Sequence, residues 1–130
     1  MNEALNKLSP HILSLLRFIS GFLMVFHGSQ KLLNYPPKEG FQMATGIMLV
    51  GGILELGGGI LLMIGLFTRW TAFILSGLMA VAYFGWHASG GFLPFVNKGE
   101  LAVILCFVYF YLFFAGGGSL SLDKLIWKKE

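Results

Sequence analysis

Four long apolar segments make up most of the chain, and short polar, glycine-rich or proline-containing stretches separate them. Each segment is close to the roughly 17–25 residues that a helix needs to cross a bilayer. We therefore predict an all-α fold, that of a polytopic membrane protein. Its four transmembrane helices should form an antiparallel bundle, at about residues 10–33, 44–67, 70–87 and 98–115.

The ends of these segments carry local signals. Ser9-Pro10 suits a helix start, because a hydroxyl group can cap the first turn and proline is tolerated there. The pair Pro36-Pro37 forbids continuation of the first helix. The connection at Thr68-Arg69 is short enough to require a helical hairpin. Asn97 and Glu100 have the spacing of a capping box, which predicts the start of the last helix.

The chain ends in a segment that differs from the four long ones. Residues 119–130 place Leu122, Leu125 and Ile126 on one helical face, with Trp127 and lysines beside them. This composition is typical of a short amphipathic helix that lies on the membrane surface. We predict one membrane domain over residues 1–130, with this tail as its interfacial part.

Composition supports the membrane class. Charged residues are 12% of the chain, about half of the roughly 25% usual in soluble domains, and 56% of the residues are hydrophobic. The net charge of +3 comes from a few loop and tail lysines, and no basic patch indicates a nucleic-acid partner. The single cysteine, Cys106, excludes an internal disulfide, a CxxC pair and a cysteine-attached haem.

The loop charges also predict an orientation. With four spans, both termini lie on one side of the membrane. That side carries Lys7, Arg69, Lys124, Lys128 and Lys129, and the opposite side carries Lys31, Lys38 and Lys98. Because cytoplasmic loops are enriched in basic residues, we expect a multi-pass protein of the inner (plasma) membrane with cytoplasmic N- and C-termini.

The first apolar segment contains ionisable groups. Arg17, Ser20, Met24, His27 and Lys31 are three or four residues apart, so they share one face of a helix. Charged groups are costly in lipid and normally face protein or a cavity. This stripe should therefore face the interior of the bundle.

Polar residues from other segments are expected at similar depth, judged from the rise of about 1.5 Å per residue. Six candidates converge on the outer half of the bundle as a ligand-binding set: His27, Gln30, Lys31, Glu55, His87 and Glu100. Arg17 lies on the opposite side, about a turn and a half from the terminal surface.

Glu55 is the strongest candidate for a functional residue, because a carboxylate in hydrocarbon must pair with a cation or take up a proton. It could form an ion pair with His27, Lys31 or Arg17 that fixes helix register, or it could handle protons or a ligand. His27 could likewise bond to Glu55 or to a backbone carbonyl rather than to a ligand.

Plainer alternatives apply to the other charged candidates. Lys31 could extend to the lipid headgroups, as could Arg17 on the opposite side. The capping box alone could explain Glu100.

The sequence gives little support for a bound haem or metal ion. His27 and His87 could ligate a haem between two helices, but one pair of histidines is thin support, and we do not predict a haem. The sequence has no metal-ligand motif, so no metal site is predicted.

Five stretches also follow one another in a recognisable order, from about Leu15 to Asp123: LLRFISGFLMVFHGSQKLL, GGILELGGGILLMIGLFTRW, LMAVA, KGELAV and GGGSLSLD. In this order and spacing the chain resembles the DoxX family of small four-helix membrane proteins. The family often has a Gly-Pro-Gly-Arg-like turn before its Ser-x-Asp, whereas this chain has Gly117 and Ser119 in place of the proline and arginine. A role for an arginine there is therefore not carried over.

The resemblance implies a link to redox chemistry. The family takes its name from a subunit associated with a thiosulfate:quinone oxidoreductase and a terminal quinol oxidase. We therefore expect a small membrane subunit of a redox or respiratory system that binds a quinone or lipid-like ligand in the outer-half pocket. An oxidoreductase partner would supply the cofactor. The alternative is an accessory, assembly or small-molecule transport protein, in the last case as a homo-oligomer.

Overall fold

The computed structural model describes residues 1–128, and every regular element in that range is helical. The long helices are α1 (Asn2–Leu33), α2 (Ile47–Ile64), α3 (Thr68–Ala82) and α5 (Glu100–Ala115). A π-helical turn, η1 (Tyr83–His87), and a 3₁₀ turn, η2 (Ala88–Gly90), continue α3. Two short helices, α4 (Pro94–Asn97) and α6 (Leu122–Trp127), precede and follow α5.

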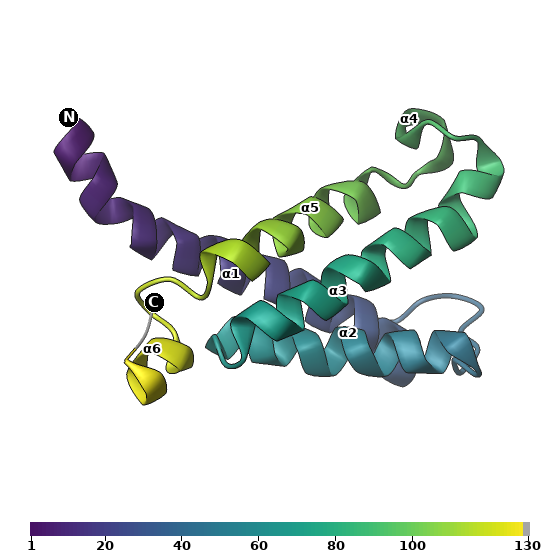
Figure 1. Ribbon diagram of the computed structural model, residues 1–130. Helices are drawn as coiled ribbons and strands as arrows, with labels where there is room; N and C mark the ends of the chain where they lie inside the picture. The colour runs from purple at the N-terminus through teal and green to yellow at the C-terminus, as the bar shows by residue number, and fades with distance from the viewer. Residues whose placement is uncertain (129–130) are drawn as a thin grey trace.

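The long helices pack as two pairs. α1 lies along α2 and α3 lies along α5, while the contacts between the pairs are sparser. Figure 1 shows the pairs close together near the α2–α3 turn and diverging toward the end that carries α4. This divergence makes room for a pocket between the pairs.

Glycines allow the α1–α2 pair to pack closely. A Cβ atom on Gly28 would lie 2.4 Å from the backbone nitrogen of Leu56, and one on Gly21 would lie 2.8 Å from the carbonyl oxygen of Gly59. Such distances leave no room for any side chain, so the two backbones are in contact, as in small-residue packing of membrane helices. Gly52 of α2 also faces α1, whereas Gly51 faces Leu78 and Gly57 faces open space.

Buried apolar side chains join the two pairs. The core consists of Met24, Leu62, Ala72, Leu75, Met79, Leu105, Tyr109 and Leu112. Tyr109 is fully buried, and its hydroxyl group donates to the carbonyl oxygen of Ser20 at 2.7 Å, which links α5 to α1. Ser76 donates to the carbonyl oxygen of Cys106 at 2.8 Å, which links α3 to α5.

The chain is a membrane protein by the length and composition of its helices. Three stretches of the described residues are long and apolar enough to cross a bilayer, namely Asn2–Leu33, Ile47–Ile64 and Thr68–Gly90. α5 is also apolar but has 16 residues. Its length of about 24 Å is less than the roughly 30 Å of a hydrocarbon core.

Several predicted boundaries are wrong. α1 begins at Asn2 rather than near Ser9, so Pro10 lies inside the helix. The α2–α3 turn occupies residues 65–67 rather than Thr68-Arg69. In both places, contacts with residues far along the chain determine the structure. The Pro10 carbonyl oxygen accepts a hydrogen bond from the Ser119 backbone N–H. The Asp123 carboxylate accepts one from the Thr68 backbone N–H and so caps α3.

The predicted capping box at the start of the last helix is also wrong. Gly99, not Asn97, is the N-cap of α5, and it makes no side-chain cap bond. Asn97 instead ends α4, and its Oδ1 accepts from the backbone N–H of Gly99 at 2.8 Å. The tail forms α6 only over Leu122–Trp127, and its predicted last residues, 129 and 130, lie outside the described residues.

Candidate functional site

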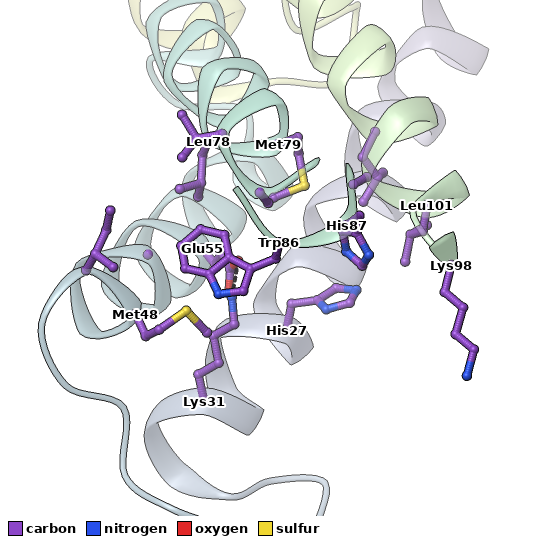
Figure 2. Close-up of a pocket in the computed structure, with 16 residues that line it drawn as sticks. His27, Lys31, Met48, Glu55, Leu78, Met79, Trp86, His87, Lys98 and Leu101 are labelled. Carbon is purple, nitrogen blue, oxygen red and sulfur yellow. Dashed lines mark hydrogen bonds and ion pairs between the residues drawn. The ribbon is translucent and has the colours of Figure 1, made fainter. Parts of the chain in front are cut away.

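A pocket of about 400 Å³ lies between the two helix pairs. We call it the Glu55 pocket. Figure 2 shows it with its lining side chains drawn as sticks. The lining residues are His27, Lys31, Ile47, Met48, Gly51, Glu55, Leu78, Met79, Val81, Ala82, Trp86, His87, Lys98, Leu101, Ala102 and Leu105. They come from α1, α2, α3, η1 and α5, with Lys98 in the turn between α4 and α5, so all four long helices contribute.

An ion pair marks the polar end of the pocket. Lys31 Nζ lies 2.7 Å from Glu55 Oε1, which joins α1 to α2. The Glu55 side chain is 4% exposed and the Lys31 side chain is 31% exposed. The second carboxylate oxygen, Glu55 Oε2, is buried and has no hydrogen-bond partner among residues 1–128. The carboxylate therefore has an unused acceptor in a pocket wall.

The π-helical turn forms another wall. η1 places Trp86 and His87 at the pocket, and π-helical turns are frequent at functional sites. His87 Nδ1 lies 3.1 Å from the carbonyl oxygen of Asn97. Asn97 Nδ2 also donates to the hydroxyl group of Tyr83, and Tyr83 donates to the carbonyl oxygen of Phe92. This network ties η1 to the α4 segment and orients the His87 ring.

The remaining walls are apolar. They consist mainly of aliphatic side chains and methionines from α2, α3 and α5. Gly51 keeps part of the pocket open: a Cβ atom there would meet only Leu78 Cδ1, at 3.9 Å. The rim also reaches the outer surface of the helices, since Ile47 and Val81 are 64% and 51% exposed. An apolar chain could leave the pocket toward lipid on that side.

The structure brings four of the six predicted ligand-binding residues together. His27, Lys31, Glu55 and His87 all line the pocket, and Figure 2 shows them around one space. Gln30 does not line it, because its side-chain amide donates to the carbonyl oxygen of Pro36 at 3.2 Å. Glu100 is exposed at the start of α5 and does not line it either.

Among the pocket residues that the sequence analysis did not name as ligand-binding, three are of particular interest, namely Trp86, Met48 and Lys98. Trp86 and Met48 are ordinary apolar residues in the sequence, and only the arrangement of the helices places them here. Lys98 also lines the pocket, although Figure 2 shows its ammonium end pointing away from Glu55.

Arg17 occupies a separate buried site, which we call the Arg17 junction. Its guanidinium group donates to the carbonyl oxygens of Leu62 at 2.7 Å, Leu120 at 2.9 Å, Met63 and Gly117. Arg17 is 3% exposed. The alternative in which Arg17 extends to lipid phosphates is therefore wrong: it joins α1, the end of α2 and the segment after α5.

Asp123 completes this junction. Its two carboxylate oxygens accept from the backbone N–H groups of Phe67 and Thr68 at 2.7 and 2.8 Å, which caps α3. The backbone N–H of Asp123 in turn donates to the carbonyl oxygen of Gly65 at 2.9 Å. The short α6 segment is thus held against the α2–α3 turn.

Comparison with known proteins shows which family this chain matches. Residues 12–88 match the DoxX family. The chain is 41% identical to an uncharacterized protein of Haemophilus influenzae over 131 residues, covering 96% of this chain and 98% of the relative. It is 38% identical to a second uncharacterized protein of that organism over 68 residues, covering 52% of this chain and 45% of the relative. No solved structure matches the chain.

Proposed function

The chain belongs to the DoxX family, and from that premise we propose that it is a small membrane subunit of a redox system that binds a quinone or a similarly lipid-like compound in the Glu55 pocket. The observation that carries the proposal is the buried Glu55 carboxylate, with one of its two oxygens unbonded within residues 1–128, in a mainly apolar pocket. Pockets for small molecules typically combine apolar walls with a few convergent polar groups.

The pocket suits an amphiphile with an oxygen-bearing ring. Its volume of about 400 Å³ falls in the range of roughly 300–1,000 Å³ that is usual for small-molecule pockets. Lys31, His27 and His87 supply hydrogen-bonding groups for ring oxygens, and Trp86 and Met48 supply flat and adaptable apolar contacts. The exposed rim at Ile47 and Val81 gives an isoprenoid tail a path into lipid.

The redox chemistry itself is assigned to a partner protein in this proposal. We propose that a partner oxidoreductase supplies the electron-carrying cofactor and that this chain holds the quinone at the membrane.

We further propose that the chain crosses the membrane four times, as an antiparallel bundle with cytoplasmic termini. Support comes from α5, which is apolar and packs along α3, and from the basic residues Arg69, Lys124 and Lys128 at the Arg17 junction end. Impermeant thiol labelling of a cysteine introduced at Lys7 or Lys98 tests this orientation, once Cys106 is replaced by Ser. Only the Lys98 position should react from outside the cell.

Tryptophan fluorescence tests quinone binding. Trp86 lies in the pocket, whereas Trp70 and Trp127 pack against Phe113 and Phe67 near the Arg17 junction. In protein with the substitutions Trp70→Phe and Trp127→Phe, we expect decylubiquinone to quench Trp86 fluorescence saturably. In matched protein that keeps only Trp70, quenching should rise linearly, by partition into the micelle.

Gly51→Leu supplies the steric control. Its side chain would enter the pocket, where the glycine has open space, so saturable quenching should be lost. Gly57→Leu, on the same helix with nothing within 4 Å of its Cβ position, should leave quenching unchanged. Equal quenching of Trp86 and Trp70 would contradict the proposal and favour an accessory or transport role.

A further inference from the structure

The two oxygens of the Glu55 carboxylate have different surroundings. Oε1 is paired with Lys31 Nζ at 2.7 Å, whereas Oε2 is buried without a partner among the described residues. As the anionic member of the ion pair, the carboxylate accepts hydrogen bonds at both oxygens and donates none. A buried acceptor left unsatisfied costs free energy. A hydrogen-bond donor beside Glu55 Oε2 would therefore stabilise the protein.

No lining side chain within residues 1–128 makes a hydrogen bond to this oxygen, the ring nitrogens of His27 and Trp86 included. Lys31 already points at Oε1, and the Lys98 ammonium group points away from Glu55 in Figure 2. His87 uses Nδ1 toward the carbonyl oxygen of Asn97. The donor is therefore expected to arrive with the ligand.

We propose that the Glu55 pocket selects the reduced, hydroxyl-bearing form of its ligand, a hydroquinone, over the oxidised quinone. This inference rests on the proposed function and deepens it. A quinone ring presents two carbonyl groups, which only accept hydrogen bonds. A hydroquinone presents O–H groups, one of which can donate to Glu55 Oε2 while its oxygen accepts from Lys31 Nζ, an ammonium group with three donors.

The effect should be large enough to measure. Oxidation of the ring removes the donor, so a lone pair on the quinone oxygen would then face the buried lone pair of Oε2. Because hydrogen bonds to charged groups are among the stronger ones, we expect decylubiquinol to bind at least about tenfold more tightly than decylubiquinone.

Competition under anaerobic conditions measures this preference. In the full chain with Trp70→Phe and Trp127→Phe, reconstituted in nanodiscs, the saturable quenching of Trp86 by decylubiquinone gives the affinity for the quinone directly. Decylubiquinol and its dimethyl ether, which keeps the ring but lacks both O–H groups, then compete with a fixed amount of decylubiquinone and relieve the quenching. The affinity obtained for the quinol should be about tenfold higher than that of the quinone, and the ether should bind no more tightly than the quinone.

Glu55→Gln ties the preference to the carboxylate. The amide can donate through its nitrogen or accept through its oxygen, so it suits both redox forms. The ratio of the two affinities should fall toward one, whereas Glu100→Gln, an exposed carboxylate outside the pocket, should keep the wild-type ratio. The comparison with the dimethyl ether needs no substitution at Glu55, so it remains decisive if Glu55→Gln does not fold.

The outcomes separate the two proposals. If no compound relieves quenching and quinone quenching is not saturable, then quinone binding itself fails. If quinone, quinol and ether bind with equal affinity, the pocket binds the ring but Glu55 Oε2 does not select the reduced form, as would happen if a bound water satisfied that oxygen. That result would overturn the inference and leave the proposed function standing.

Discussion

The two ends of the molecule each bury a charged side chain, but the two side chains differ in how completely they are hydrogen-bonded. At the Arg17 junction the guanidinium group is 3% exposed and donates to four backbone carbonyl oxygens. At the Glu55 pocket the glutamate is also 3% exposed, yet one of its two oxygens has no partner within the described part of the chain. A buried charged group whose hydrogen bonds are all made within the protein holds helices together. A buried charged group that keeps an unbonded oxygen beside a pocket can instead bind a ligand there.

Backbone connectivity explains the difference. Arg17 contacts carbonyl oxygens where α2 ends and in the segment after α5, and these are groups that a helix cannot satisfy by itself. Glu55 lies in the middle of α2, where backbone groups are already used within the helix. Its only charged neighbour across the interface is Lys31, as far as residues 1–128 show. The remaining oxygen therefore stays available.

Arg17→Met should have the largest effect on stability. It removes the donors for carbonyl oxygens at the end of α2 and in the segment after α5, and loss of one member of a buried charged network costs about 3–5 kcal/mol. Thermal unfolding in detergent, followed by circular dichroism, measures it. Arg17→Lys should recover only part of the loss, because an ammonium group cannot reproduce the planar fork.

Lys7→Met, an exposed cation on the same helix, is the control and should leave the unfolding temperature unchanged. If Arg17→Met and Lys7→Met unfold at the same temperature, the Arg17 junction does not stabilise the fold and the contrast between the two ends is lost.

Gly28→Ala should rank second. Its new Cβ would lie 2.4 Å from Leu56 N and 2.7 Å from Gly52 O, so α1 and α2 must move apart, at a cost of about 1–3 kcal/mol. Gly57→Ala is the matched control on an exposed face, and it should be neutral or stabilise by up to about 1 kcal/mol, because alanine favours helix. The same unfolding assay compares them, and equal stability would contradict the close backbone contact.

Asp123→Asn should cost less, about 1–2 kcal/mol, because it weakens the cap on α3 while keeping one acceptor. Protection of the Phe67 and Thr68 amides from hydrogen exchange reports this change locally. Unchanged protection at both amides would show that Asp123 does not hold the α2–α3 turn.

Glu55→Gln should have the smallest effect on stability, below about 1 kcal/mol. Lys31 is partly exposed and can turn its ammonium group toward water when its partner is gone. Binding should change more than unfolding does. A loss of stability as large as that of Arg17→Met would make Glu55 a structural residue and erase the distinction between the two ends.

The sequence predicted the membrane class and the helices well, because apolar length and helix-breaking residues act locally. Helical spacing and depth also predicted part of the pocket: His27, Lys31, Glu55 and His87 line it, whereas Gln30 and Glu100 do not. It could not predict the saturation of Arg17, which depends on carbonyl groups about 45 and 100 residues away. Backbone acceptors carry no sequence signal.

Two errors have the same origin. The predicted cap at Asn97 and the predicted start at Ser9-Pro10 are sound local motifs, but tertiary contacts use those residues differently. Asn97 bonds to Tyr83 and Gly91 to shape the wall that carries His87. The divergence of the helix pairs, which forms the pocket, is likewise a property of packing rather than of any one segment.

The most direct test of ligand binding is to identify what the protein carries when it is purified from its own membrane in mild detergent. Organic extracts of wild-type and Gly51→Leu protein would be compared by mass spectrometry, with Gly57→Leu as the control for handling. We expect a prenylated quinone or hydroquinone at near-stoichiometric amounts in the wild-type and Gly57→Leu proteins, and at trace amounts in Gly51→Leu. Equal amounts in all three proteins, or none in any, would contradict a quinone site in the Glu55 pocket.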